Sequence, residues 1–370
     1  MIKADSLVNA LYFSCICTLL CLCSCSKKAV PVKAEETTFT WEVTTTGVPH
    51  TYLLDQLPGI ASYEGKTYML GGAGAMWNSF TDPAAFNAWA MRKGSKMDDL
   101  ELQEQPKMVQ NFPDLHTEGN DWCFYWLMGL WIDPASGTFY SIAYSEYNYL
   151  NGWVTEAKER RMGLATSLDK GRTWRYQGDI ITQDKSAPPP AGQQYYGAGD
   201  LSLLIPGDGY VYVYYKKGFY SLTTLNRSAQ DICVARCLLS DKFAPGKWHK
   251  FYNGTWTEAG LGGRETIVIP YVNIANVVFN EYLQKYVCIG NAVSGKTFIA
   301  FANSLEKQDW TERDFTFPDI THHYNWQVNT TDNNPYIMGQ TFRLYTCGLD
   351  ITTTPNTKTG KYYTIKFIKK

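Results

Sequence analysis

Short apolar runs alternate with clusters of turn-forming residues from about residue 50 onward. Runs of this length, bounded by Gly, Asn, Asp or Pro, are typical of β-strands joined by tight turns. The pattern predicts five strand–turn–strand units, in residues 60–70, 129–144, 201–215, 276–290 and 341–368. The protein is therefore expected to be all-β.

A second repeat lies out of phase with the first. Residues 167–174 have the pattern S-x-D-x-G-x-T-W, which resembles the Asp box of sialidases and other β-propeller proteins. Gly171 can adopt the positive φ of a tight turn, and Asp169 can bond to the backbone of its own turn. Trp174 begins the returning strand and is expected to pack under the loop, as a structural residue.

Two degenerate copies of this pattern end at Trp248 and Trp310, so the three tryptophans follow one another at intervals of 74 and 62 residues. Such intervals suit a four-stranded propeller blade with inserted loops. Together the two repeats predict a five-bladed β-propeller of four-stranded antiparallel blades. A sixth blade would require splitting residues 72–125, and a pair of β-sandwiches would not explain the interleaved repeats.

The composition narrows the class of partner. The chain has 370 residues, 45% of them hydrophobic, which is enough for a large core. Its net charge is −1 and no stripe of Lys and Arg stands out, so nucleic-acid binding has no electrostatic support. Aromatic residues make up 15%, which favours β-structure or a surface on which sugars stack.

The N-terminus reads as a targeting segment. An apolar run from Leu7 to Leu22 is too short to span a bilayer comfortably, and it ends in Leu22-Cys23-Ser24-Cys25. This ending resembles a bacterial lipobox with Cys25 as the lipidated residue, and the alternative is an ordinary signal peptide rich in cysteine. We expect a signal peptide in residues 1–25, a polar tether in 26–44 and one propeller domain in 45–370.

The resemblance to a lipobox implies a protein of the bacterial cell envelope, on the outer membrane or facing the periplasm. Membrane contact would then occur through acyl chains only. The five remaining cysteines are scattered and lack metal-ligand spacing, so most of them are expected to be buried apolar residues. No cofactor is expected, a structural calcium ion is left open, and the protein is expected to be monomeric.

Candidate catalytic groups should lie just before the innermost strands, whose leading ends face the central funnel of a propeller. Asp200 follows Gly197-Ala198-Gly199 and immediately precedes an apolar strand, although it could simply bond to its own turn. Glu265 follows a Gly-rich loop, so a buried carboxyl with a raised pKa could serve as a general acid. The alternative for Glu265 is a salt bridge with Arg264.

Further candidates come from the other predicted blades. Glu118 shares a strand face with His116 if that segment is extended, so the two could tune a pKa or form a plain hydrogen-bonded pair. Glu146 follows an aromatic strand, with an exposed surface position as its alternative. At most one of His322 and His323 can face the funnel. Sugar-stacking candidates are Trp77, Trp122, Trp126, Tyr195, Tyr196 and Trp326, each of which could instead be core.

The mature chain resembles five-bladed propeller glycosidases of the broad family 43 type, found in lipoproteins of gut-type Bacteroidetes. The resemblance implies three carboxylates from successive blades, acting as base, pKa modulator and acid. Asp200 matches the modulator position, and Glu265 or Glu118 could be the acid. The first blade departs from the family pattern, because Asp55 is only a weak substitute for the base. Predicted substrate-binding residues are His116, Glu146, Arg264, Tyr195, His323 and Trp326.

Three functions remain open on the sequence alone. The first is a glycoside hydrolase that acts on a plant or host oligosaccharide or polysaccharide through funnel carboxylates. The second is a glycan-binding surface lipoprotein without catalysis. The third is an exo-sialidase, which the Asp box favours, although an arginine triad for the substrate carboxylate is not recognisable.

Overall fold

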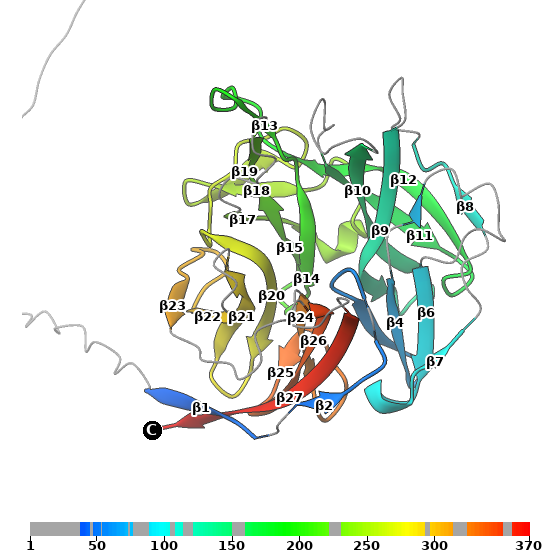
Figure 1. Cartoon of the computed structure of the whole chain (residues 1–370), viewed down its shortest axis with the longest axis vertical. Coiled ribbons are helices and arrows are strands. Elements are labelled where there is room, and N and C mark those ends of the chain that lie inside the picture. Colours follow the sequence, from blue (N-terminus) through cyan, green and yellow to red (C-terminus); the bar gives the residue numbers. More distant parts are fainter. Residues whose placement is uncertain are drawn as a thin grey trace, which may run out of the picture. The chain divides into compact units, whose positions relative to one another are not determined.

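Five antiparallel sheets lie around a common centre and form a β-propeller (Figure 1). The structure is a computed structural model. It describes residues 38–44, 47–52, 54–72, 75–76, 89–103, 108–113, 121–149, 160–221, 231–292, 297–313, 324–350 and 357–370. The predicted all-β class and the five blades of four antiparallel strands are confirmed. Among the described residues, helix is limited to two short 3-10 turns, η2 (Met97–Asp99) and η3 (Leu239–Asp241).

Each blade has four strands, which follow one another from the centre of the ring outward. The first blade is β3 (Gly59–Tyr63), β4 (Lys66–Gly72), β6 (Trp89–Gly94) and β7 (Glu101–Leu102). The second is β9 (Asp121–Ile132), β10 (Phe139–Tyr149), β11 (Arg161–Ser167) and β12 (Thr173–Thr182). The third is β14 (Gly199–Leu204), β15 (Tyr210–Lys217), β17 (Asp231–Leu238) and β18 (His249–Tyr252). The fourth is β20 (Val272–Asn280), β21 (Lys285–Ala292), β22 (Thr297–Ala302) and β23 (Thr311–Arg313). The fifth is β24 (Tyr324–Asn329), β26 (Thr341–Asp350), β27 (Thr357–Lys369) and β1 (Phe39–Val43).

Short strands extend these blades. The second blade gains β5 (Ala75–Met76) and β8 (Met108–Gln110), and the third gains β19 (Thr255–Ala259). The fourth gains β25 (Ile337–Met338), and the fifth gains β2 (Val48–Pro49). A separate pair, β13 (Gln193–Tyr195) and β16 (Phe219–Ser221), forms a two-stranded arm beside the third blade.

The ring is closed by strands from both ends of the propeller. β1 pairs antiparallel with β27, with Phe39 opposite Lys369 and Val43 opposite Ile365 (Figure 1). The sequence predicted a tether through residue 44, whereas Phe39–Val43 is the outermost strand of the fifth blade. The aromatic and β-branched residues of that segment favour a strand, which its polar flanks concealed.

Four of the five predicted hairpins are inner-strand hairpins. They are β3–β4, β9–β10, β14–β15 and β20–β21. The fifth predicted unit corresponds to β26 and β27, the second and third strands of its blade, because the inner strand β24 comes earlier in the chain.

The blades pack against one another through apolar side chains on both faces of their strands. Leu70 and Met91 of the first blade share a core cluster with Leu127 and Ala143 of the second. All six residues of β22 are buried. Strands covered on both sides lose the period-2 alternation and read as continuous apolar runs.

Side chains also fill the centre of the ring. A cavity of about 20 Å³ remains there, large enough for about one water molecule, and it is lined from all five inner strands. Its lining includes Ile60, Gly129, Leu203, Asn276 and Gln327.

The three Asp-box tryptophans occupy equivalent places. The segments that end at Trp174, Trp248 and Trp310 join the third and fourth strands of the second, third and fourth blades. In an antiparallel blade that begins at the entry end of the inner strand, the connection from the third to the fourth strand lies on the opposite face. These turns therefore lie away from the strand-entry face.

The first of these turns is held by its own side chains. The amide of Thr173 donates to Asp169 Oδ1 at 2.8 Å, and Gly171 has a φ of +90°. The indole Nε1 of Trp174 donates to the Gly171 carbonyl at 3.1 Å, and Trp174 is fully buried. Asp169 and Trp174 thus stabilise the turn.

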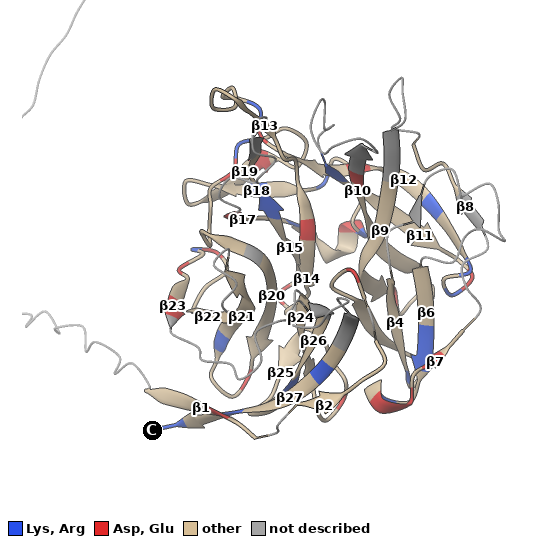
Figure 2. Ribbon diagram, viewed as in Figure 1, with Lys and Arg blue, Asp and Glu red and all other residues tan. Residues whose placement is uncertain are grey.

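Charged residues are spread over all five blades (Figure 2). Among the described residues no helix is long and apolar enough to cross a membrane. The four described cysteines with free thiols are buried, as predicted: Cys233, Cys237, Cys288 and Cys347.

Candidate active site

Three carboxylates from successive blades lie near the hydroxyl of Tyr324, the first residue of β24. The Tyr324 hydroxyl is 3.5 Å from Asp55 Oδ1, and Asp55 precedes the inner strand of the first blade. Burial raises the pKa of Tyr324 well above its ordinary value, and the charges of Asp200, Asp55 and Glu146 raise it further. Glu146 and Asp200 are linked through Arg160, the Tyr196 ring and Lys216, and all three carboxylates lie at the strand-entry ends of their blades.

Asp200 is presented by an irregular strand entry. Its φ of +44° lies in the left-handed region, which is uncommon for a residue other than glycine. The register between β14 and β15 also shifts between Gly199 and Ser202, as in a β-bulge. Bulges and left-handed residues redirect a side chain away from the regular alternation of a strand, and they are frequent at functional sites.

The two glycines before Asp200 allow the chain to pass through a crowded place. A Cβ on Gly197 would lie 2.3 Å from the backbone nitrogen of Arg160, and Gly197 has a φ of +92°. A Cβ on Gly199 would lie 2.1 Å from a ring carbon of Tyr144. The sequence Gly-Ala-Gly-Asp is therefore what close packing against the second blade requires.

Asp200 forms an ion pair with Lys216, which comes from the neighbouring strand β15. The lysine side chain is 1% exposed and the carboxylate is 15% exposed. The hydroxyl of Tyr196 donates to Asp200 Oδ2 at 3.1 Å, and the Lys216 ammonium lies 5.2 Å from the centre of the Tyr196 ring. Asp200 is thus anchored from below while part of its carboxylate faces solvent.

Glu146 has a similar arrangement. It forms an ion pair with Arg160, whose side chain is buried, and the Tyr144 hydroxyl is 3.4 Å from Glu146 Oε2. The Arg160 guanidinium lies 4.2 Å from the centre of the Tyr196 ring. Because Tyr196 contacts both cations, the Glu146 and Asp200 pairs form one connected cluster.

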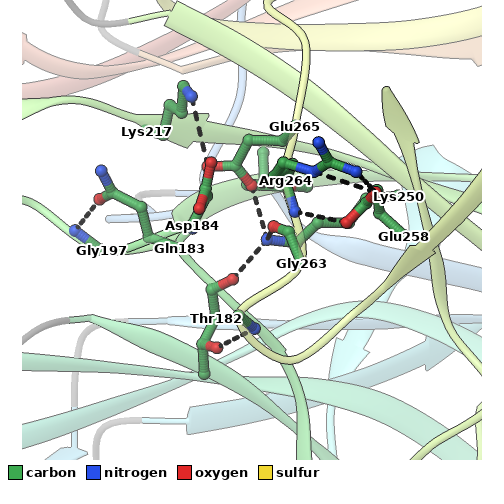
Figure 3. A network of polar contacts seen from close by, with 12 residues as sticks. Thr182, Gln183, Asp184, Gly197, Lys217, Lys250, Glu258, Gly263, Arg264 and Glu265 are labelled. Atoms are coloured by element: carbon green, nitrogen blue, oxygen red, sulfur yellow. Dashed lines mark hydrogen bonds and ion pairs between the residues drawn. The ribbon is translucent and has the colours of Figure 1, made fainter. Parts of the chain in front are cut away.

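Glu265 belongs to a different network (Figure 3), in which the side chains of Glu265 and Lys250 are fully buried. Its Oε2 accepts from Lys250 at 2.7 Å and from the Tyr215 hydroxyl at 2.6 Å, and Lys217 lies 3.4 Å from Oε1. The amide of Asp184 donates to Oε1 at 3.3 Å. With no exposed side-chain surface, Glu265 is placed as a structural ion pair and not as a group that meets a substrate.

The alternative partner considered for Glu265 is wrong. Arg264 turns outward and pairs with Glu258, with its NH2 nitrogen 2.7 Å from Glu258 Oε1 (Figure 3). Glu258 lies in β19, just before the connection that carries Arg264. The amide of Arg264 donates to Glu258 Oε2 at 3.0 Å, which holds the two residues side by side. Adjacent residues in an extended segment point to opposite sides.

Two of the predicted sugar-binding aromatics have structural contacts. Trp326 is 2% exposed and stacks on Tyr345, with ring centres 5.5 Å apart and an angle of 11°. Tyr195 lies on the β13–β16 arm, 5.9 Å from the ring of Phe219, and is partly exposed. In this structure Trp326 is a core residue, whereas Tyr195 retains an accessible face.

Several predicted residues fall outside the described part of the chain. These are Trp77, His116, Glu118, His322, His323 and the lipidation candidate Cys25, and the side chain of Trp122 is likewise outside the description. Their assignments remain predictions. Within the described ranges, no group of three His, Cys, Asp or Glu side chains is placed to hold a metal ion.

The cluster also contains residues that the sequence did not single out. Lys216 and Arg160 supply the cations, and Tyr324 supplies the hydroxyl near all three carboxylates. For Lys216 a signal existed, because the strand it ends is otherwise strongly apolar. Arg160 and Tyr324 border stretches without a repeat pattern, so the sequence offered no comparable sign.

Comparisons with known proteins agree with the architecture. No protein-family model matches the sequence, and no curated protein sequence matches it. A family 117 glycoside hydrolase from the marine bacterium Zobellia galactanivorans matches with a TM-score of 0.50 and 10% identity, over 90% of this chain and 91% of that chain. A family 43 β-1,3-galactosidase, determined with galactodeoxynojirimycin, has a TM-score of 0.47 and 12% identity, over 87% and 94% of the two chains. The catalytic domain of a family 62 α-L-arabinofuranosidase from Coprinopsis cinerea has a TM-score of 0.47 and 9% identity, over 89% and 97%.

The match with a TM-score of 0.50 concerns the fold. The chain is a five-bladed propeller similar in architecture to glycoside hydrolases, and at such low identity no residue role is carried over from them.

Proposed function

We propose that the protein is a glycoside hydrolase that acts on a plant or host glycan at the cluster around Asp55, Glu146 and Asp200. The observation that carries this proposal is the placement of three carboxylates from successive blades at the strand-entry face: Asp55 lies 3.5 Å from the Tyr324 hydroxyl, and the ion pairs of Glu146 and Asp200 are joined through Tyr196. Glycoside hydrolysis requires two carboxyl groups that flank the scissile bond, one as acid and one as base or nucleophile. The propeller architecture is consistent with that chemistry without fixing it.

The ion pairs divide the roles among the carboxylates. A carboxylate held against a buried cation suits the role of base, nucleophile or electrostatic modulator, which needs the charged form. Asp200 with Lys216 and Glu146 with Arg160 fit these roles. The general acid is then Asp55 or the predicted Glu118, and the burial of Glu265 favours a structural role.

An activity screen with matched variants tests the proposal. The wild-type protein is incubated with 4-nitrophenyl glycosides and with xylo-, arabino- and galacto-oligosaccharides. On any substrate that is cleaved, Asp200→Asn should lower kcat/KM by about 10³-fold, the middle of the range for acid–base groups. Asp208→Asn is the control, because Asp208 lies in the turn at the other end of the same hairpin, and it should stay within twofold. Wild-type activity in Asp200→Asn would remove Asp200 from the mechanism.

The acid can be identified by the leaving group. A 4-nitrophenolate departs without protonation, whereas a sugar alcohol needs a proton from the general acid. Removal of the acid should therefore impair oligosaccharide cleavage far more than cleavage of the aryl glycoside. Asp55→Asn and Glu118→Gln are compared in this way, and equal losses on both substrates would exclude that residue as the acid.

Glycan binding without cleavage is the second candidate. It is favoured by the pairing of both Asp200 and Glu146 with buried cations, which makes them fixed hydrogen-bond acceptors. In that case calorimetry should detect oligosaccharide binding by a wild-type protein that cleaves none of the panel. Release of sialic acid from a fluorogenic sialoside would instead support the exo-sialidase alternative.

We further propose that Cys25 carries a lipid anchor on the bacterial cell envelope. The proposal rests on the apolar run and the Leu-x-Ser-Cys sequence at its end. In cells fed a radiolabelled fatty acid, the wild-type protein should be labelled and should fractionate with membranes. Cys25→Ala should be unlabelled, and labelling of that variant would exclude Cys25.

A further inference from the structure

Tyr271 is an exposed aromatic residue at the entry of an inner strand. It immediately precedes β20, so it lies on the strand-entry face on which the carboxylates converge. Its side chain is highly exposed, at 67%, whereas most described aromatic residues are buried in the core. The connection from β19 to β20 carries two further exposed apolar residues, Leu261 and Ile267.

The backbone holds Tyr271 in an unfavourable conformation. Its φ is +58°, in the left-handed region, where a bulky side chain is disfavoured. The amide of Tyr271 donates to Asp231 Oδ1 at 3.1 Å, and the chain just before it is tied to β17 by the Ile232–Ile269 bridge. These contacts hold the backbone from which the ring projects, although the ring itself gains little from burial.

A strained residue whose side chain is not buried calls for an explanation outside packing. Strain of this kind persists where the surrounding structure determines it, and it is concentrated at ligand sites. Asp200 shows the same combination of left-handed backbone and partial exposure on the neighbouring inner strand. Tyrosine offers a large rigid surface with little conformational entropy to lose on binding.

We propose that Tyr271 is a stacking platform for a sugar ring of the substrate outside the carboxylate cluster, on the rim between the third and fourth blades. The proposal rests on the proposed function and specifies it further, because a platform held beside the start of β17 and outside the cluster implies a substrate of several sugar units. The flat apolar face of the ring would contact the C–H groups of a pyranose or furanose, and the hydroxyl would remain in solvent.

The test compares short and long substrates. Tyr271→Ala should raise KM about tenfold for a xylo-, arabino- or galacto-hexasaccharide, the size of one aromatic stacking contact. The KM for the matching 4-nitrophenyl monosaccharide should change less than twofold. Tyr271→Phe should retain the wild-type KM, and Ile267→Ala, an exposed apolar residue of the same connection, is the matched control.

Tyr271→Gly separates the binding role from a structural one. Glycine relieves the left-handed strain, so this variant should melt no lower than Tyr271→Ala while it shows the same rise in KM. If Tyr271 had only a structural role, Tyr271→Gly would be more stable than Tyr271→Ala and its KM would return toward the wild-type value.

The outcomes distinguish this proposal from the proposed function. If the wild type cleaves the hexasaccharide and Tyr271→Ala leaves its KM within twofold, or impairs the aryl glycoside equally, the platform is excluded and the hydrolase stands. If the wild type cleaves nothing but binds a hexasaccharide in calorimetry, a tenfold weaker Tyr271→Ala supports the platform alone, and unchanged binding excludes it. A wild type that neither cleaves nor binds these probes overturns both.

Discussion

Two carboxylate–lysine networks lie at the end of β15. Both are ion pairs of a carboxylate with lysine, but their carboxylates differ in exposure and in backbone conformation. Lys216 and Lys217 are consecutive, so they point to opposite faces of the strand. Lys216 pairs with Asp200 on the strand-entry face, and Lys217 contacts Glu265 inside the third blade. Asp200 is 15% exposed, whereas Glu265 has no exposed surface.

The backbone distinguishes the two carboxylates as clearly as exposure does. Asp200 lies in a left-handed conformation within a register shift, and two glycines are needed to bring it there. Glu265 has an ordinary backbone and accepts hydrogen bonds from a tyrosine, a lysine and a backbone amide. The buried ion pairs of Glu265 thus favour a structural role, whereas the strained backbone, partial exposure and carboxylate neighbours of Asp200 are compatible with the role proposed for it.

Removal of the buried carboxylate should have the largest effect on stability. Glu265→Gln leaves Lys250, which is fully buried, without its counter-charge. Breaking one partner of a buried pair is expected to lower the free energy of unfolding by about 3 to 5 kcal/mol. Urea unfolding followed by tryptophan fluorescence measures the change.

Glu258→Gln is the control for this comparison, because Glu258 pairs with Arg264 on the surface of the same region. A solvent-screened surface pair contributes little, so this variant should unfold at nearly the same urea concentration as the wild type. Under conditions in which Glu265→Gln is folded, its kcat on a cleaved substrate should stay close to the wild-type value. A loss as deep as that of Asp200→Asn would instead establish Glu265 as part of the catalytic machinery, as the sequence suggested.

An alanine at Gly199 should disturb the exposed network through packing alone. Its Cβ would lie 2.1 Å from the ring of Tyr144, which contacts Glu146. Overpacking of this kind is expected to cost about 1 to 3 kcal/mol and to displace Asp200, so activity should fall together with stability. Gly339→Ala is the control, because Gly339 lies outside the left-handed region and the nearest atom to the added Cβ, Asn329 Oδ1, is 3.7 Å away. Equal activity in the two variants would show that the approach of Tyr144 does not position Asp200.

The repeats in the sequence sufficed for the fold. Hairpins with a clear turn, such as the one at Glu64 and Gly65, recur along the chain, and the turns that end at Trp174, Trp248 and Trp310 recur in three of the five blades. Together these local patterns were enough to predict the number of blades. The closing strand Phe39–Val43 escaped prediction because its partner, β27, lies at the other end of the chain. A pairing between the two ends leaves no trace in a local pattern.

The candidate site was only partly predictable, for a related reason. Asp200 stands out because glycines and an apolar strand surround it in the sequence. Asp55 and Glu146 have no such surroundings, and their proximity to Tyr324 arises only when the first, second and fifth blades close into a ring. Glu265 follows a glycine-rich loop, as the sequence shows, but the lysines that neutralise its charge come from β15 and β18, outside that loop.

A third carboxylate–lysine pair, formed by Asp133 and Lys242, has a half-exposed lysine. Its removal should have the smallest effect on stability of the changes considered. Asp133, in the β9–β10 turn, accepts from Lys242, Ser136 Oγ and the amide of Ala135, and these hydrogen bonds lower its pKa to about 2. An unfolded Asp has a pKa of about 3.9, so the stabilisation is complete above that value and is lost as the pH falls from about 4 to about 2. Asp133→Asn should therefore be less stable than the wild type at pH 6, and the difference should shrink toward pH 2 in urea titrations. Because the Lys242 side chain is half-exposed, high salt should weaken its share of the effect. A difference between the two proteins that is constant from pH 6 to pH 2 would mean that the carboxylate charge contributes nothing, and that the turn depends on geometry alone.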